Sequence, residues 1–318
     1  MIAFVFPGQG SQAVGMGRAL VEAHDEARAA FAEADAAYDS EGGTDTLSGL
    51  CFEGPADRLA LTETTQPAIL ATSIAACRVL EARGCRPDIV AGHSLGEYSA
   101  HVAAGTFAFG DAVRVVRRRG RYMQEAVPAG QGAMAAVLGA DLELVQRACE
   151  EAAEGQVVAP ANINGPGQVV IAGDAAAVGR AGERARALGA RRVVPLPVSA
   201  PFHCALMRPA QARLEPELRA LAAQDPRVPV VANVDATPRR EARAAVDALV
   251  AQVSAPVQWE SVVRRLASEG VTTYVEVGPG TVLGGLIRKI HPEARVTGFA
   301  APEDLGAVMT ACSISPTR

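Results

Sequence analysis

The sequence predicts an α/β fold, in which a parallel β-sheet is covered by helices on both faces and a small ferredoxin-like domain is inserted. Short apolar strands alternate with helical segments near both ends of the chain, which is typical of a parallel sheet. The order changes to βαββαβ in the middle of the chain, which is the order of the ferredoxin-like unit. The 318 residues suffice for one large domain with such an insert. We expect the large domain to comprise residues 1–127 and 198–318, and the insert residues 128–197.

Glycine and proline residues end the apolar segments in the first third of the chain. An apolar run stopped by a Pro-Gly pair predicts a strand at residues 2–6, and a second run after Gly84 predicts a strand at 89–92. Asp111 is expected to cap the helix that follows it. The predicted helices of this part lie at residues 11–20, 25–38, 67–82, 95–104 and 111–127.

The insert and the C-terminal part also alternate between strands and helices. The insert is predicted to have strands at 133–138, 157–161, 169–172 and 192–196, with helices at 141–153 and 174–188. Because the two ends of such a unit lie close together, it can be inserted into another domain. Beyond the insert, helices are predicted at 206–223, 240–251, 259–269 and 281–290, and strands at 230–233, 272–277 and 296–300. The tail after residue 301 is weakly patterned and is expected to fray.

Composition and charge exclude several classes of protein. The net charge is -5, so a global basic field is absent and no nucleic-acid partner is expected. Neither a long apolar run nor a signal-peptide pattern occurs, so we expect a cytoplasmic chain that does not enter a membrane. The six cysteines are not spaced as CxxC and no histidines cluster beside them. We therefore expect free thiols, and neither a metal site nor a disulfide scaffold.

The segment Gly-His-Ser-Leu-Gly at residues 92–96 is the sharpest functional signal in the sequence. It has the pattern G-x-S-x-G and lies where a predicted strand turns into a predicted helix, as in a nucleophile elbow. In such an elbow Ser94 is a nucleophile, and the N–H of Leu95 can donate to an oxyanion. Ser94 and Glu97 also have the S-x-x-E spacing of a helix capping box, which would explain the serine without catalysis.

Arg119 is out of step with the other arginines of its predicted helix. Its neighbours three and four residues away are apolar, so its side chain is expected to point inward. A buried guanidinium needs an anion, which is either a substrate carboxylate held by two parallel N–H bonds or an internal Asp or Glu. The remaining arginines share one face, which is either a solvated helix surface or attractive to phosphates or an acidic partner; they are Arg114, Arg117, Arg118 and Arg121.

His203 and the loop after the first strand supply two further candidates. A serine nucleophile needs a base, histidine is the usual one, and His203 lies just after a predicted strand. A lone histidine beside Phe202 is also common as a packed core residue. The glycine-flanked Gln9 can present its backbone N–H as a second donor to the same oxyanion.

Seven motifs, spread over nearly the whole chain, form one pattern. They are FPGQGSQ ending at Gln12, GHSLGEYSA at 92–100, RGRYMQEAVP at 119–128, ANINGPGQVVIAG at 161–173, HCALM at 203–207, PVQW at 256–259 and EVGPG at 276–280. With these motifs the sequence resembles bacterial malonyl-CoA:acyl carrier protein transacylases, including the free-standing acyltransferases that serve polyketide synthases.

The resemblance implies a Ser–His site in a large α/β-hydrolase-like domain with an inserted ferredoxin-like domain. Gln252 matches a position that orients the histidine through a backbone carbonyl, in place of a triad aspartate. The other implied roles are Ser94 as nucleophile, His203 as base, Gln9 and Leu95 as oxyanion-hole donors, and Arg119 as the clamp on the free malonyl carboxylate.

Phe202 departs from many free-standing fatty-acid transacylases of this kind, in which a small serine precedes the histidine. In the similar acyltransferase domains of polyketide synthases, phenylalanine at this position goes with malonyl and serine with methylmalonyl. A bulky ring leaves less room for an α-methyl branch, although one methyl group in a pocket is worth only about 1–3 kcal/mol. The resemblance and this ring therefore favour malonyl.

The expected function is the transfer of malonyl from malonyl-CoA to the phosphopantetheine thiol of an acyl carrier protein, for fatty acid or polyketide biosynthesis. The resemblance implies a coenzyme A thioester as substrate and no bound cofactor. Two alternatives stay open: a serine ester or thioester hydrolase on the same fold, and a non-catalytic scaffold that binds carrier protein. An acid that orients His203 would favour the hydrolase, and none stands out between Ser94 and His203.

Overall fold

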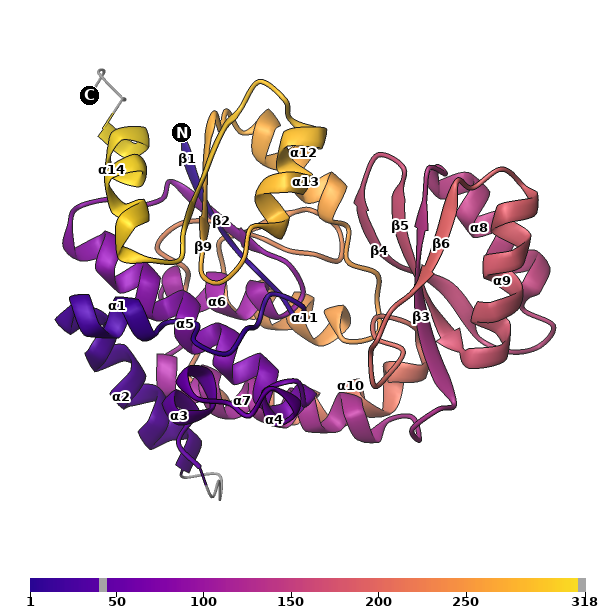
Figure 1. Ribbon diagram of the computed structural model, residues 1–318, viewed down its shortest axis with the longest axis horizontal. Helices are drawn as coiled ribbons and strands as arrows, with labels where there is room; N and C mark the ends of the chain where they lie inside the picture. Colours follow the sequence, from indigo (N-terminus) through magenta and orange to yellow (C-terminus); the bar gives the residue numbers. More distant parts are fainter. Residues whose placement is uncertain (40–44, 314–318) are drawn as a thin grey trace.

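Two β-sheets organise the chain, and the computed structural model describes residues 1–39 and 45–313 of it (Figure 1). The strands of the larger sheet are β1 (Ile2–Phe6), β2 (Ile89–Gly92), β7 (Val230–Val231), β8 (Pro238–Arg239), β9 (Thr273–Val277) and β10 (Arg295–Phe299). They lie in the order β10-β9-β1-β2-β7-β8 and are parallel, except that β8 runs antiparallel to β7. The predicted parallel sheet is therefore confirmed.

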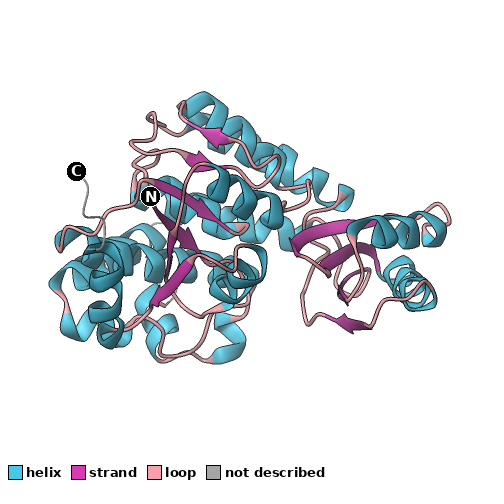
Figure 2. Cartoon of the chain, turned by 90° about the horizontal axis from the view of Figure 1, so that it is seen from above, coloured by secondary structure: helices cyan, strands magenta, loops and turns pink. Residues whose placement is uncertain are grey.

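Helices cover both faces of the larger sheet, as Figures 1 and 2 show from two directions. They are α1 (Arg18–Ala23), α2 (Asp25–Asp39), α3 (Leu47–Phe52), α4 (Ala56–Leu59), α5 (Thr62–Ala82), α6 (Leu95–Ala103), α7 (Phe109–Glu125), α10 (Arg208–Ala220), α11 (Ala242–Gln252), α12 (Trp259–Ser268), α13 (Val282–Ile290) and α14 (Leu305–Ser313). Two short 3-10 helices occupy Ala205–Met207 and Pro302–Asp304. In the part of the chain that the structure describes, none of the helices is long and apolar enough to cross a bilayer.

Alternate residues of the central strands enter two separate cores. Phe4 and Phe6 of β1 are fully buried in the core that includes residues of α5, α6 and α7. Ala3 and Val5 of the same strand are fully buried in the core formed with α12 and α13. Because both faces of the strand are covered, its sequence is a continuous apolar run instead of an alternating one.

The smaller sheet forms a ferredoxin-like unit, in agreement with the predicted order of elements. Its members along the chain are β3 (Gly132–Leu138), α8 (Leu142–Ala152), β4 (Val158–Gly165), β5 (Gln168–Asp174), α9 (Ala175–Ala187) and β6 (Arg192–Pro195). The strands lie in the order β4-β5-β3-β6 with antiparallel neighbours, and both helices cover one face (Figure 1). The domain boundaries at residues 127/128 and 197/198 remain a prediction.

Strand β4 of the small domain forms backbone hydrogen bonds with the larger domain. The N–H of Ile163 donates to the carbonyl oxygen of Val257 at 2.9 Å, and the N–H of Val257 donates to that of Ala161 at 2.9 Å. Asn162 and Val257 accordingly form a parallel bridge. The polar residues of β4 are thereby fixed beside the segment that leads into α12.

Two local predictions are wrong in the N-terminal half. The chain does not form a helix at 11–20, because Gly15 and Gly17 both have positive φ and α1 begins only at Arg18. Asp111 does not cap α7, whose N-cap residue is Ala108. The short elements α3, α4 and β8 were not predicted.

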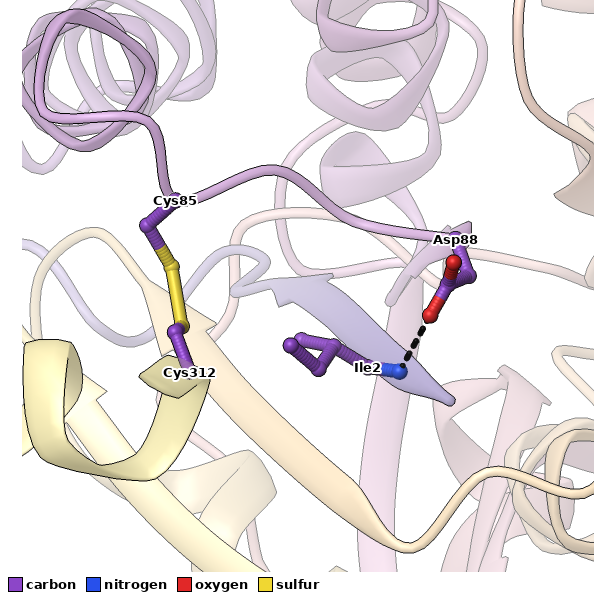
Figure 3. Close-up of a disulfide and its surroundings, with 4 residues drawn as sticks. All are labelled: Ile2, Cys85, Asp88 and Cys312. Atoms are coloured by element: carbon purple, nitrogen blue, oxygen red, sulfur yellow. Dashed lines mark hydrogen bonds between the residues drawn. A yellow bond between two sulfur atoms is a disulfide. The ribbon is translucent and has the colours of Figure 1, made fainter. Parts of the chain in front are cut away.

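The C-terminal segment contradicts two further predictions. Val308 of α14 is fully buried, so the described tail after residue 301 packs and does not fray; residues 314–318 lie outside the described part. Cys85 and Cys312 form a disulfide, so the prediction of free thiols is wrong for this pair (Figure 3). Beside it, the N–H of Ile2 at the start of β1 donates to the carboxylate of Asp88 at 2.8 Å. The free, buried cysteines are Cys51, Cys77, Cys149 and Cys204.

We expect Cys312→Ser to lower the free energy of unfolding by about 2–4 kcal/mol in non-reducing buffer, because the disulfide closes a long loop in the unfolded chain. The two cysteines are 227 residues apart in sequence. Urea unfolding with and without dithiothreitol measures the effect. Reductant should lower the stability of the wild type to that of the variant and leave the variant unchanged, whereas equal stability of both proteins in non-reducing buffer would contradict the assignment.

Candidate active site

Ser94 lies in a tight turn at the carboxyl end of β2, immediately before α6. Its backbone φ is 52°, which is uncommon for a residue other than glycine. Two glycines permit this turn: a Cβ at Gly92 would overlap the backbone of Gly96, and a Cβ at Gly96 would overlap the carbonyl oxygen of Phe6. The strand and the helix can therefore approach as closely as a nucleophile elbow requires.

The side chain of Ser94 faces His203 and does not cap α6. Its Oγ lies 2.7 Å from His203 Nε2, and it makes no capping hydrogen bond to the helix, so the capping-box alternative is wrong. His203 Nδ1 lies 3.0 Å from the backbone oxygen of Gln252, which can only accept. The proton is accordingly on Nδ1, and Nε2 is free to accept the hydroxyl proton of Ser94.

The environment of His203 keeps its imidazole neutral. The residue is buried, and its φ of 60° lies in the left-handed region. Burial, together with the positive charge of Arg119, lowers the pKa of His203 to about 3. Near neutral pH the ring is therefore in the form that can take up a proton.

Arg119 projects into the same site from α7 and is only 1% exposed. Its guanidinium donates to Gln66 Oε1 at 2.8 Å, to Gln252 Oε1 at 2.9 Å and to Ser94 Oγ at 3.2 Å. The guanidinium carbon Cζ also lies over the ring of Tyr98, 5.3 Å from the ring centroid. Among the described residues no carboxylate contacts it, although the charge of Glu97 acts on it from beyond Gln252, and its Nε–H has no acceptor. The alternative that Arg119 forms a direct structural ion pair with an internal Asp or Glu is therefore not supported.

Two backbone N–H groups beside the elbow make no hydrogen bond within the described residues: those of Gln9 and Leu95. Leu95 is the first residue of α6, where N–H groups lack a helical acceptor. The loop of Gln9 lies against the elbow, since a Cβ at Gly8 would overlap the backbone of His93. Both N–H groups are thus available to a ligand.

Most of the predicted site residues line one pocket of about 120 Å³ between the two domains, whereas Leu95 and Gln252 do not line it. Phe202 forms part of its wall and is buried. The polar lining consists of Gln9, Gln66, His93, Ser94, Arg119, Asn162 and His203, and the apolar lining of Met123, Met134, Leu196, Val198 and Phe202. The structure thus brings the predicted serine, histidine, arginine, phenylalanine and Gln9 together.

Several polar residues of this site were missed from the sequence. Gln66 binds Arg119, and Asn164 of β4 lies 2.8 Å from His93, where it accepts from the Nε2–H of the ring. Asn233 accepts from the N–H of Ser94 at 2.7 Å. Asn164 lies within the motif at 161–173, which does not by itself indicate a role for this residue, and Gln66 and Asn233 belong to no local pattern that indicates chemistry. Gln66 in an apolar helix is nevertheless a signal of the same kind as Arg119.

Two arginines on the basic face of α7 form ion pairs with neighbouring acids, and a third, Arg117, donates to the backbone oxygen of Tyr38 at 2.8 Å. Arg114 forms an ion pair with Asp111 at 2.5 Å, and Arg118 with Glu217 at 3.2 Å. These pairs are partly exposed, as on an ordinary solvated helix surface. The structure therefore favours the solvated surface for this face.

A serine at a strand-to-helix elbow, hydrogen-bonded to a neutral histidine above a parallel sheet, defines the class of serine-based acyl-transferring and ester-cleaving enzymes. Residues 3–304 match the acyl transferase domain family, so the chain belongs to that family.

Known relatives are similar over nearly the whole chain. The malonyl CoA-acyl carrier protein transacylase of Salmonella typhimurium is 50% identical over 309 residues, which cover 97% of this chain and 98% of the relative. The crystal structure of an acyl carrier protein S-malonyltransferase from Vibrio cholerae has a TM-score of 0.93 at 45% identity, covering 96% of this chain and 99% of its own. A malonyl-transacylase solved in complex with a type II PKS acyl-carrier protein has a TM-score of 0.93 at 44% identity, and the match covers 98% of this chain and 99% of that structure's chain.

Proposed function

We propose that this chain transfers a malonyl group from malonyl-CoA to the phosphopantetheine thiol of an acyl carrier protein. The observation that carries the proposal is that the hydrogen-bonded pair of Ser94 and His203 shares one pocket with the guanidinium of Arg119, which has no counter-charge in contact. A free carboxylate on the acyl group would supply that charge. The names of the similar proteins support the same pair of substrates.

In the first half-reaction the malonyl carboxylate binds Arg119. His203 Nε2 removes the hydroxyl proton of Ser94, and Oγ attacks the thioester carbonyl carbon. The N–H groups of Gln9 and Leu95 stabilise the oxyanion. Collapse of the tetrahedral intermediate breaks the C–S bond, and His203 returns the proton to the sulfur of coenzyme A.

In the second half-reaction the carrier thiol gives its proton to His203, and its sulfur attacks the ester carbonyl carbon. The C–O bond breaks, and Ser94 regains its proton from the histidine. The backbone oxygen of Gln252 holds the imidazole in the required tautomer throughout. Every step uses side chains and backbone groups of this chain, and no bound cofactor takes part.

The two alternative functions are less well supported. A hydrolase of this fold orients its histidine with a carboxylate, whereas the acceptor here is the neutral backbone oxygen of Gln252. A non-catalytic scaffold has no need for a serine held at positive φ within 2.7 Å of an imidazole.

Intact-mass spectrometry tests the proposal. Mixing the protein with malonyl-CoA should add the mass of one malonyl group, and adding a phosphopantetheinylated carrier protein should move that mass to the carrier. Release of coenzyme A at the same rate with and without carrier would indicate the hydrolase. Absence of any adduct or transfer would indicate the scaffold.

We also propose that the reaction takes place in the cytoplasm, in line with the sequence-based expectation. Disulfides are rare in that reducing compartment. The Cys85–Cys312 disulfide is therefore unusual for that compartment.

Phe202→Ser should make the pocket accept a branched acyl group more readily. Removing the ring creates room beside His203, so we expect kcat/KM for methylmalonyl-CoA relative to malonyl-CoA to rise by about tenfold, the effect of roughly one methyl group. Phe202→Leu, which keeps an apolar side chain, should give an intermediate ratio. Competition between the two thioesters, read by mass on the carrier, measures the ratio, and an unchanged ratio in both variants would remove Phe202 from specificity.

A further inference from the structure

A buried carboxyl group that takes no part in the proposed mechanism lies behind the pocket. Glu97, in the first turn of α6, is fully buried. Its Oε2 accepts from Gln252 Nε2 at 2.7 Å and from the backbone N–H of Asn233 at 3.0 Å. Its Oε1 has no hydrogen-bond partner among the described residues. Burying a carboxyl group with one oxygen that accepts no hydrogen bond costs free energy of folding. This cost suggests that the hydrogen bonds to the other oxygen have a function.

The bond to Gln252 decides which way the amide of that residue faces. Because Glu97 Oε2 is an acceptor, the amide nitrogen must point toward it, and the amide oxygen then points to the guanidinium of Arg119 at 2.9 Å. The same nitrogen donates to the backbone oxygen of Ser94 at 2.9 Å. A flipped amide would place an oxygen against Glu97 and a nitrogen against Arg119, so both contacts would be lost.

Gln252 therefore joins the two functional side chains of the site. Its side-chain oxygen holds Arg119, and its backbone oxygen accepts from His203 Nδ1 at 3.0 Å. A shift of this one residue would misplace the guanidinium and the imidazole together. Displacements of about 1 Å in such groups are enough to lower catalytic rates strongly.

The bond to Asn233 supports the elbow from the other side. With its backbone N–H held by Glu97, Asn233 accepts from the N–H of Ser94 at 2.7 Å and donates from Nδ2 to the carbonyl oxygen of Gly92 at 2.7 Å. These two contacts bracket the residue at positive φ and stabilise a turn that the backbone would not otherwise favour.

We propose that Glu97 is a positioning residue for acyl transfer, which aligns the catalytic groups through its hydrogen bonds to Gln252 and Asn233 without touching the substrate. The inference rests on the residue roles proposed above. Burial raises the pKa of Glu97 to about 7. A proton on the empty Oε1 would leave Oε2 able to accept both bonds, so the acceptor oxygen is the essential group and the charge is not.

Two substitutions separate the acceptor from the rest of the side chain. Glu97→Gln can keep an oxygen at the Oε2 position, and we expect kcat/KM for malonyl-CoA within about threefold of wild type. Glu97→Leu keeps a similar volume but removes the acceptor, and we expect a loss of about 10–100-fold, chiefly in kcat. The ratio of malonyl to acetyl transfer should also fall in Glu97→Leu, because Arg119 loses its fixed position, and should be kept in Glu97→Gln.

A matched control is Glu276→Leu at a second buried glutamate. Glu276 accepts from the backbone N–H groups of Leu283 and Gly284 at the start of α13, and it does not line the pocket. It should lower Tm and leave the malonyl-to-acetyl ratio unchanged. The inference is overturned if folded Glu97→Leu keeps the wild-type ratio, or if Glu97→Gln loses as much activity as Glu97→Leu. Failure of the proposed function would appear separately, as a wild-type protein that neither acquires a malonyl adduct nor transfers malonyl.

Discussion

Ser94→Ala should leave the protein folded and remove the malonyl adduct from its mass spectrum. The hydroxyl is the only group at this position that can form the ester, and His203 then has no proton to accept from it. Transfer to carrier protein should fall by at least about 10⁴-fold, as when the nucleophile of a serine enzyme is deleted. Intact-mass spectrometry after mixing with malonyl-CoA measures the adduct, and release of coenzyme A measures the rate.

Ser99→Ala provides the matched control for this experiment. Ser99 is buried in the same helix, α6, and its hydroxyl has no hydrogen-bond partner among the described residues. This variant should acquire the malonyl adduct and transfer it as the wild type does. A full adduct in Ser94→Ala would move the nucleophile to another residue, whatever the fate of the control.

The elements that could be predicted are those with a local physical cause. The elbow at Ser94 follows from two glycines that leave room for backbone contacts, and such a requirement is visible in five consecutive residues. Arg119 was expected to point inward because it interrupts an apolar helix face, and it does. The ferredoxin-like unit was predicted because its strands and helices are long enough to show their period.

The groups that were missed depend on partners far away in the sequence. The bonds of Glu97 to Asn233 and to Gln252 join residues 136 and 155 positions apart, and no spacing rule indicates them. The Cys85–Cys312 disulfide was missed for the same reason, because its two cysteines are 227 positions apart. The short helices α3 and α4 have 6 and 4 residues, which is too few to show a helical period in the sequence. Helices of this length are stabilised by tertiary packing, which local sequence does not reveal.

Arg119→Ala should reduce malonyl transfer strongly while sparing acetyl transfer. The malonyl carboxylate would lose a buried guanidinium, a loss of about 3–5 kcal/mol, which corresponds to about 10²–10⁴-fold in kcat/KM. Acetyl has no carboxylate, so its transfer should change by no more than about fivefold. Arg119→Lys, which keeps the charge but not the two parallel N–H groups, should lie between these limits. Transfer of each acyl group to carrier protein, followed by mass, gives both rates.

The contrast between the two acyl groups distinguishes a substrate clamp from a structural arginine. Arg119 also holds Gln66 and Gln252, so its removal disturbs the site for every substrate to some degree. That disturbance lowers acetyl and malonyl transfer alike, whereas loss of the carboxylate contact lowers malonyl alone. Arg114→Ala, on the same helix but paired with Asp111 at the surface, should leave both rates unchanged. Equal losses for the two acyl groups in Arg119→Ala would make the arginine a structural residue, and the preference for malonyl would then need another source in the pocket.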